Sequence, residues 1–167
     1  MKKILIAIDY NPCSQKIAET GFEYALATNA EMCIVHAIAD IAYYSMEYAP
    51  IMGFNGFSPD TAYKNIDEQE KEAEEFLSAV VKHLGGVNIE TKVLNGKTSE
   101  IILQYAAEYD ASLIVMGSQS HSSFEKVLMG NVVADVLKHS LIPVMIVPAE
   151  KQDLNLLSRK HDVLHYI

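Results

Sequence analysis

The stretch from residue 113 to 148 constrains the fold more than any other part of the sequence. It starts with an apolar run over 113–116, passes through Gly117 into a Ser-rich segment, takes a helical pattern over 124–140 and ends in a second apolar run from Pro143 to Val147. Short apolar runs that alternate with helices are typical of parallel strands covered on both faces. Loops that leave such strands just before a helix favour anions, phosphate above all.

The rest of the chain repeats this alternation. Apolar strands are predicted over 4–8 and 32–38, and a more polar strand over 87–94, near a sheet edge. Helices are predicted over 12–28, 61–84 and 98–110, with Asn11 as the cap of the first and Thr98 or Ser99 as the cap of the third. The sequence therefore predicts a single-domain α/β fold, an open five-stranded parallel sheet with helices on both faces. The domain is expected to span 1–148, with 149–167 as a C-terminal tail.

One long segment, residues 39–60, has no periodicity and is rich in Tyr, Met and Gly. Segments of this kind serve as lids or binding loops, or they pack their own aromatic side chains against the body or a neighbouring subunit. We favour packing. His36, inside an apolar run just before this segment, is expected to be a core histidine with a hydrogen-bond partner.

Composition narrows the function further. A formal net charge of −9 argues against nucleic-acid binding, which needs Lys and Arg to displace counterions from phosphates. No apolar run is long enough for a membrane span, and the start Met1-Lys2-Lys3 leads into a short apolar run that does not match a signal peptide, so we expect a cytoplasmic protein without membrane contact. Cys13 and Cys33 are expected to be structural thiols, and no metal site is indicated.

Standard catalytic and nucleotide motifs are missing. The sequence has neither a Walker A motif nor G-x-G-x-x-G after its first strand, and His121 beside serines lacks the elbow of a serine hydrolase. No catalytic residue is predicted, so hydrolysis of any bound ligand would be slow at most. Backbone N–H groups of the loop that begins at Gly117, including that of Ser118, are expected to face an anion, with Ser122 and Ser123 as supporting hydroxyls. The alternative is a Ser-rich surface turn that satisfies its own backbone.

Two segments of this region carry a resemblance to a known family. Met116-Gly117-Ser118-Gln119-Ser120, nine residues, and then Gly130-Asn131-Val132 is similar to the signature of the universal stress protein family, which ATP-binding members write as G-x-x-G, nine residues, G-[S or T]. The first strand with Asp9 and the end of the second strand resemble the family as well. The resemblance implies a Rossmann-like fold of the adenine nucleotide alpha hydrolase-like type. It also implies a homodimer and a site for ATP, with Mg²⁺, or AMP at the carboxyl edge of the sheet.

The resemblance assigns a nucleotide-binding role to one set of residues: Ala7, Ile8, Asp9, Ala37, Met116, Gly117, Gln119, Ser120, Gly130, Asn131 and Val132. Ser120 and Asn131 depart from the pattern, because the family has Gly and Ser or Thr there. Two hypotheses follow: a regulatory protein that binds an adenine nucleotide, which we favour, or a dimeric interaction protein whose loop binds only an anion or nothing. The apolar last strand from Pro143 to Val147 would be an exposed edge unless its twin covers it, so a homodimer through this strand is expected.

Overall fold

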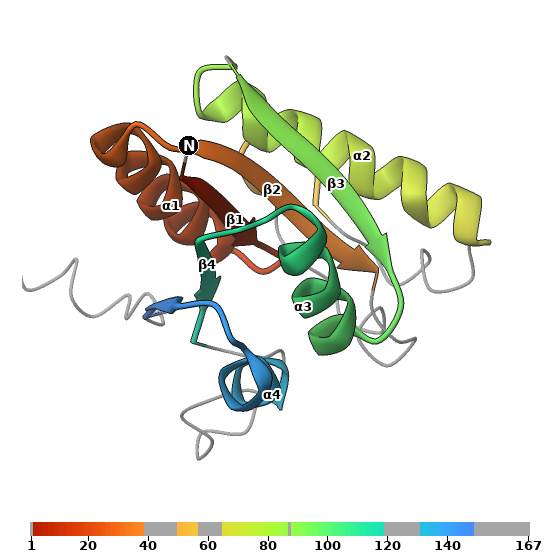
Figure 1. Ribbon diagram of the computed structural model, residues 1–167. Coiled ribbons are helices and arrows are strands. Elements are labelled where there is room, and N and C mark those ends of the chain that lie inside the picture. The colour runs from red at the N-terminus through yellow and green to blue at the C-terminus, as the bar shows by residue number, and fades with distance from the viewer. Residues whose placement is uncertain (1, 39–49, 57–64, 87, 119–130, 149–167) are drawn as a thin grey trace, which may run out of the picture.

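The computed structural model of the protein describes residues 2–38, 50–56, 65–86, 88–118 and 131–148. Its elements follow in the order β1 (Lys3–Ala7), α1 (Ser14–Thr28), β2 (Glu31–Ile38), α2 (Ile66–His83), β3 (Ile89–Asn95), α3 (Thr98–Glu108), β4 (Leu113–Gly117), α4 (Asn131–His139) and β5 (Val144–Val147) (Figure 1). The predicted alternation of strand and helix is therefore confirmed. Of the helix predicted over 124–140, residues 124–130 lie outside the described part of the chain.

The strands form one parallel sheet in the order β3-β2-β1-β4-β5. The chain first moves outward from β1 through β2 to β3, and then returns to the other side of β1 to add β4 and β5. The strand order thus reverses between β1 and β4, the topological switch point at which open α/β sheets bind ligands. The strand predicted near an edge, β3, is one of the two edge strands, and three of its consecutive residues are exposed.

Each face of the sheet carries its own core. Helices α1 and α2 cover one face over Ile4, Ile6 and Ile34, and α3 and α4 cover the other over Leu5, Cys33 and Ile114 (Figure 1). Alternate residues of the central strands enter opposite cores, which explains why these strands are continuously apolar.

The predicted N-cap residues of helices α1 and α3 differ from those in the structure. Helix α1 starts at Ser14 rather than near residue 12, because Asn11 forms a turn instead: its carbonyl accepts from the Ser14 N–H at 2.8 Å and its side chain accepts from the Cys13 N–H at 3.0 Å. Helix α3 starts at Thr98 with Lys97 as its cap residue, so neither Thr98 nor Ser99 is a cap. The Ser99 hydroxyl donates to Asp135 of α4 at 3.4 Å, a contact between helices that local capping rules do not foresee.

Helix α2 begins at Ile66, behind a cap that the sequence analysis missed. The Asn65 side chain accepts from the Glu68 N–H at 3.0 Å, and the Glu68 carboxylate accepts from the Asn65 N–H at 3.2 Å. This reciprocal pair is a capping box. The apolar stripe of α2, which includes Ala73, Phe76 and Val80, is buried as predicted.

Residues 50–56 belong to the long segment without periodicity. Ile51, Met52 and Phe54 are buried in the core under α1 and α2, and Ile51 and Phe54 pair their backbones across a tight turn. This described part therefore packs against the body of the domain. The remainder of the segment, 39–49 and 57–60, lies outside the described residues.

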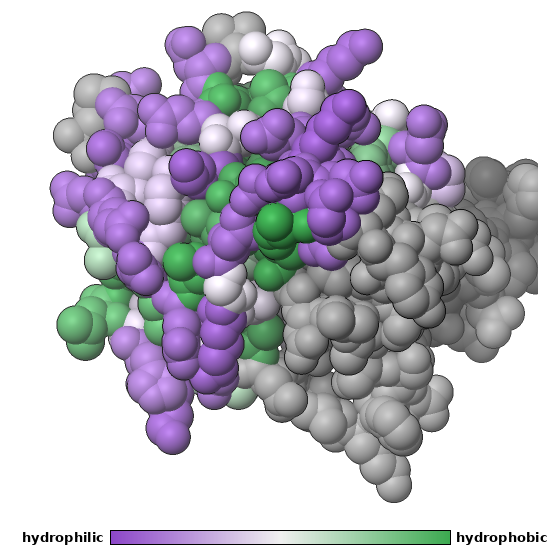
Figure 2. Space-filling model, turned by 90° about the vertical axis from the view of Figure 1, so that its right-hand side faces the viewer, coloured by the Kyte–Doolittle hydropathy of each residue, from purple (hydrophilic) through white to green (hydrophobic). Residues whose placement is uncertain are grey.

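One face of the molecule is mainly polar (Figure 2). On the side shown in Figure 2, hydrophilic side chains cover most of the coloured area and hydrophobic ones form small separate areas between them. None of the helices in the described ranges is long and apolar enough to cross a membrane.

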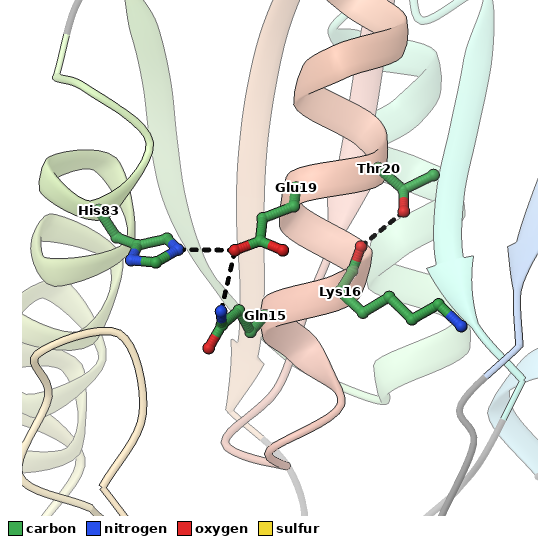
Figure 3. Close-up of polar contacts among 5 residues, drawn as sticks. All are labelled: Gln15, Lys16, Glu19, Thr20 and His83. Carbon is green, nitrogen blue, oxygen red and sulfur yellow. Dashed lines mark hydrogen bonds and ion pairs between the residues drawn. The ribbon is translucent and has the colours of Figure 1, made fainter. Parts of the chain in front are cut away.

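Helices α1 and α2 are joined by a polar contact (Figure 3). The Glu19 carboxylate accepts from His83 Nε2 at 2.8 Å and from Gln15 Nε2 at 2.9 Å. The bond from His83 lowers the pKa of the Glu19 carboxyl below its ordinary value, and the Gln15 amide adds to this effect. Folding thus favours the ionised form of Glu19.

We expect Glu19→Gln to lower the free energy of unfolding by about 0.5 kcal/mol near neutral pH, because both side chains are partly exposed to solvent, which weakens the pair. A carboxyl whose pKa is lower in the folded state contributes stability above its unfolded-state pKa and loses it as the pH falls through the folded-state value. In urea-unfolding experiments, the difference between variant and wild type should therefore shrink as the pH falls through the lowered pKa of the Glu19 carboxyl. Glu23→Gln, at an exposed position on the same helix, is the control and should change the free energy of unfolding at neutral pH less than Glu19→Gln does.

Candidate functional site

The candidate site lies where β1, β2 and β4 end, at the switch point. In the sheet, β1 ends at Ala7 opposite Val35, whereas β2 continues to Ile38 and β4 to Gly117. The residues assigned to the nucleotide on these strands therefore meet at one edge. Helix α1 starts a few residues after β1, so its N-terminus faces the same edge.

Asp9 is held in place by its own turn. Its carboxylate oxygen Oδ1 accepts from the Asn11 N–H at 2.8 Å and from the Ser14 hydroxyl at 2.9 Å, and the same hydroxyl accepts from the Asp9 N–H at 3.1 Å. Ser14 is fully buried. These bonds fix the carboxylate at the N-terminus of α1, where the helix dipole favours a negative charge.

Ser14 was missed by the sequence analysis, although a small hydroxyl residue at the start of a helix, five positions after a strand-end Asp, is a usable signal. Cys13, beside it, is half-buried, and its pKa is raised, first by burial and then by the charge of Asp9. Burial also raises the pKa of Cys33 to about 11. Both thiols are thus protonated at neutral pH, as expected of structural cysteines.

The backbone of Ala37 points toward the side of β2 on which β1 has already ended. The Ile8 N–H donates to the Val35 carbonyl at 3.0 Å, so the backbone groups of Val35 point toward β1. Those of Ala37, two residues on, point the same way, because the direction alternates along a strand. Beyond Ala7, however, β1 is no longer a strand. Among the described residues the Ala37 N–H forms no hydrogen bond on that side.

The Ile8 carbonyl, which would otherwise continue the ladder, accepts from His36 Nδ1 at 3.1 Å. Because a carbonyl only accepts, Nδ1 carries the proton. His36 is fully buried, with its ring centroid 4.4 Å from that of Tyr10 and 5.7 Å from that of Phe76. The prediction of a core histidine with a partner is confirmed.

Gly117 ends β4, and its lack of a side chain has a packing reason. A Cβ atom there would lie 2.5 Å from Ile17 Cδ1 of α1, closer than atoms can approach. The next residue corrects a prediction: the Ser118 N–H donates to the Val147 carbonyl of β5 at 3.0 Å, so it extends the sheet and does not face an anion. Met116 is buried under α3 and α4.

The structure places only two of the remaining assigned residues. Asn131 is the first residue of α4, and Val132, half-buried, packs against the core under α3 and α4. The others lie outside the described residues: Gln119, Ser120, Ser122, Ser123 and Gly130. Within the described ranges, no cluster of three or more His, Cys, Asp or Glu residues could hold a metal ion.

Comparison with known proteins decides the family. The model of the Universal stress protein family matches residues 1–148. The chain is 30% identical over 155 residues to universal stress protein MJ0531 of Methanocaldococcus jannaschii, covering 91% of this chain and 85% of that protein. The chain belongs to the universal stress protein family.

Solved universal stress protein structures share this fold. The structure of MJ0577 of Methanocaldococcus jannaschii superimposes with a TM-score of 0.69 at 21% identity, covering 90% of this chain and 98% of that one. A universal stress protein from Archaeoglobus fulgidus, solved in complex with dAMP, gives a TM-score of 0.60 at 21% identity, covering 87% and 97%. The Rossmann-like fold implied by the resemblance is thereby confirmed.

Removing the Ser14 hydroxyl should destabilise this universal stress protein. In Ser14→Ala, the part-buried N–H and carboxylate of Asp9 each lose their bond to a fully buried hydroxyl, so we expect the free energy of unfolding to fall by about 2 kcal/mol. Ser112→Ala is the matched control, because its hydroxyl donates to the Lys3 carbonyl at 2.9 Å on the exposed opposite edge. That variant should lose about 0.5 kcal/mol or less. Equal losses in urea unfolding would show that burial of the Asp9 turn contributes nothing special.

Proposed function

We propose that this universal stress protein is a regulatory protein that binds an adenine nucleotide at the carboxyl edge of its sheet. The observation that carries the proposal is the Ala37 backbone, which faces past the end of β1 beside a fixed carboxylate, Asp9. Adenine presents an acceptor nitrogen next to an amino group. The Ala37 N–H and carbonyl have the complementary donor and acceptor.

The other groups at this edge suit the rest of a nucleotide. A carboxylate such as that of Asp9 accepts hydrogen bonds from ribose hydroxyls, and it is already oriented by Ser14 and Asn11. The chain enters α4 at Asn131, and a helix N-terminus favours phosphate. The complex of the Archaeoglobus fulgidus protein with dAMP supports an adenine nucleotide as the class of ligand.

AMP is the nucleotide that we expect to bind best. The Ser118 N–H is already used by β5, and Ser120 stands where the family signature has Gly, so this loop has fewer groups and less room for a polyphosphate. ATP, with Mg²⁺ carried on its phosphates, is proposed as the weaker ligand. The Asp9 carboxylate already accepts hydrogen bonds from Asn11 and Ser14, so a binding role fits it better than a role as general base.

Calorimetric titration with AMP, ATP and cyclic AMP tests the proposal. We expect saturable binding of AMP, and at least tenfold weaker binding by Asp9→Asn, about 1.4 kcal/mol, because an amide oxygen accepts a weaker hydrogen bond than a carboxylate. The variant keeps an oxygen for Ser14 and Asn11, so the turn should stay folded. Asp110→Asn is the control. This exposed aspartate precedes β4, at the amino ends of the strands, and the variant should bind AMP as wild type does.

If wild type binds none of the three nucleotides, the nucleotide function is wrong. The interaction protein without a nucleotide then becomes the better interpretation. If Asp110→Asn weakens AMP binding as much as Asp9→Asn does, the loss comes from general charge and does not identify the Asp9 turn as the site.

We further propose a homodimer that pairs through β5. This strand is the sheet edge beside β4, and three of its four residues, Val144, Met145 and Ile146, are only half-buried in the single chain. Leu141, just before the strand, is fully exposed. An apolar sheet edge of this kind is a hazard for aggregation unless another chain covers it.

Light scattering at tens of micromolar should give the mass of a dimer. Leu141→Lys should raise the dissociation constant of the dimer at least tenfold, because it places a charge beside the pairing edge in each copy. Leu26→Lys, also largely exposed but on α1, is the control and should leave the dimer intact. A monomeric wild type would rule out the dimer and leave the nucleotide proposal standing.

A further inference from the structure

We propose that His36 is a positioning residue that keeps the Ala37 N–H available for the adenine ring. Its side chain donates to the Ile8 carbonyl, which would otherwise accept from the Ala37 N–H in the ladder between β1 and β2. This inference rests on the proposed function for its ligand, and on the hydrogen bonds of the described residues for its mechanism.

The register of β1 and β2 shows which bond is replaced. Ala7 lies opposite Val35, and the Ile8 N–H donates to the Val35 carbonyl at 3.0 Å. The next bond of a regular parallel ladder would run from the Ala37 N–H to the Ile8 carbonyl. That bond is not formed, and β1 ends at Ala7.

The side chain of His36 replaces the Ala37 N–H as the donor to the Ile8 carbonyl. Its Nδ1–H donates to the Ile8 carbonyl at 3.1 Å, so the carbonyl keeps a partner although the ladder has ended. Without such a partner, a buried carbonyl would recover its bond by pairing with the donor that the ladder register offers, which is the Ala37 N–H. The substitute bond therefore separates the two backbone groups.

The histidine ring is fixed by packing. Its centroid lies 4.4 Å from the Tyr10 ring and 5.7 Å from the Phe76 ring, and it has no exposed surface. Tyr10 follows Asp9 directly, so the same aromatic contacts hold the turn that carries the carboxylate. The donor of His36 is thus pre-organised before any ligand binds.

The consequence is selectivity for the base. A ring nitrogen that accepts from Ala37, beside an amino group that donates to its carbonyl, matches AMP. IMP has the reverse arrangement, a ring N–H beside a carbonyl oxygen, and would leave polar groups of the site without partners. Ribose phosphate lacks the base and reports on the rest of the site alone.

The first test needs no ligand. Scalar couplings across hydrogen bonds, measured by NMR on the wild-type protein, should connect His36 Nδ1 with the Ile8 carbonyl carbon and should not connect the Ala37 nitrogen with it. In His36→Leu, which keeps an apolar side chain but no donor, the coupling from Ala37 should appear. A coupling from Ala37 to Ile8 in the wild type would overturn the inference, whether or not AMP binds.

The second test measures selectivity. His36→Leu should bind AMP about tenfold more weakly than wild type and lose the preference for AMP over IMP, with ribose phosphate affinity unchanged. His36→Asn, whose amide places a donor close to the position of Nδ1, should keep the wild-type preference for AMP over IMP. Phe76→Leu is the control for packing: it should lower stability without changing the ratio of AMP to IMP affinity.

The outcomes separate the inference from the proposed function. A His36→Leu variant that keeps the preference for AMP overturns the inference while nucleotide binding stands. If the Leu variant does not fold, the wild-type couplings and the selectivity of His36→Asn still decide. A wild type that binds no AMP overturns the proposed function, and with it the ligand step of the inference, even where the couplings are as expected.

Discussion

The early end of the central strand decides where this sheet opens. β1 lies between β2 and β4, yet it stops at Ala7 while both neighbours run on. The backbone at this point does not lose its partners. The Ile8 carbonyl passes to a histidine side chain, and the Asp9 N–H passes to the Ser14 hydroxyl. Side chains thus replace the ladder, and the Ala37 N–H on β2 forms no bond to β1.

The fold was predictable because parallel strands and their helices leave strong patterns in a sequence. Strands buried on both faces are continuously apolar, as in β1 and β4, and an edge strand such as β3 shows its exposed residues. The starts of the helices were less predictable. Ser99 was expected to cap α3, but its hydroxyl reaches Asp135 on another helix, and only the packing of α3 against α4 brings these two side chains together.

The sequence could predict which strand ends meet at the candidate site, but not the hydrogen bonds that form there. Asp9 and Ala37 follow or end apolar strands, so their place at one edge followed from the parallel sheet and the family resemblance. The bond between His36 and Ile8 joins residues 28 positions apart, and it depends on a register that no sequence pattern states. The same holds for Ser118, whose N–H looked available until the pairing of β4 with β5 assigned it to Val147.

Residues in the first turns of α1 contact the ends of three strands. Ser14 binds the Asp9 turn after β1, Ile17 packs against Gly117 at the end of β4, and Lys16 Nζ donates to the Pro148 carbonyl after β5 at 3.1 Å. A Cβ at Gly117 would lie 2.5 Å from Ile17 Cδ1, so the absence of a side chain there lets Ile17 pack closely on the end of β4. A nucleotide beside Asp9 and a second chain against β5 would therefore act on the same short piece of helix.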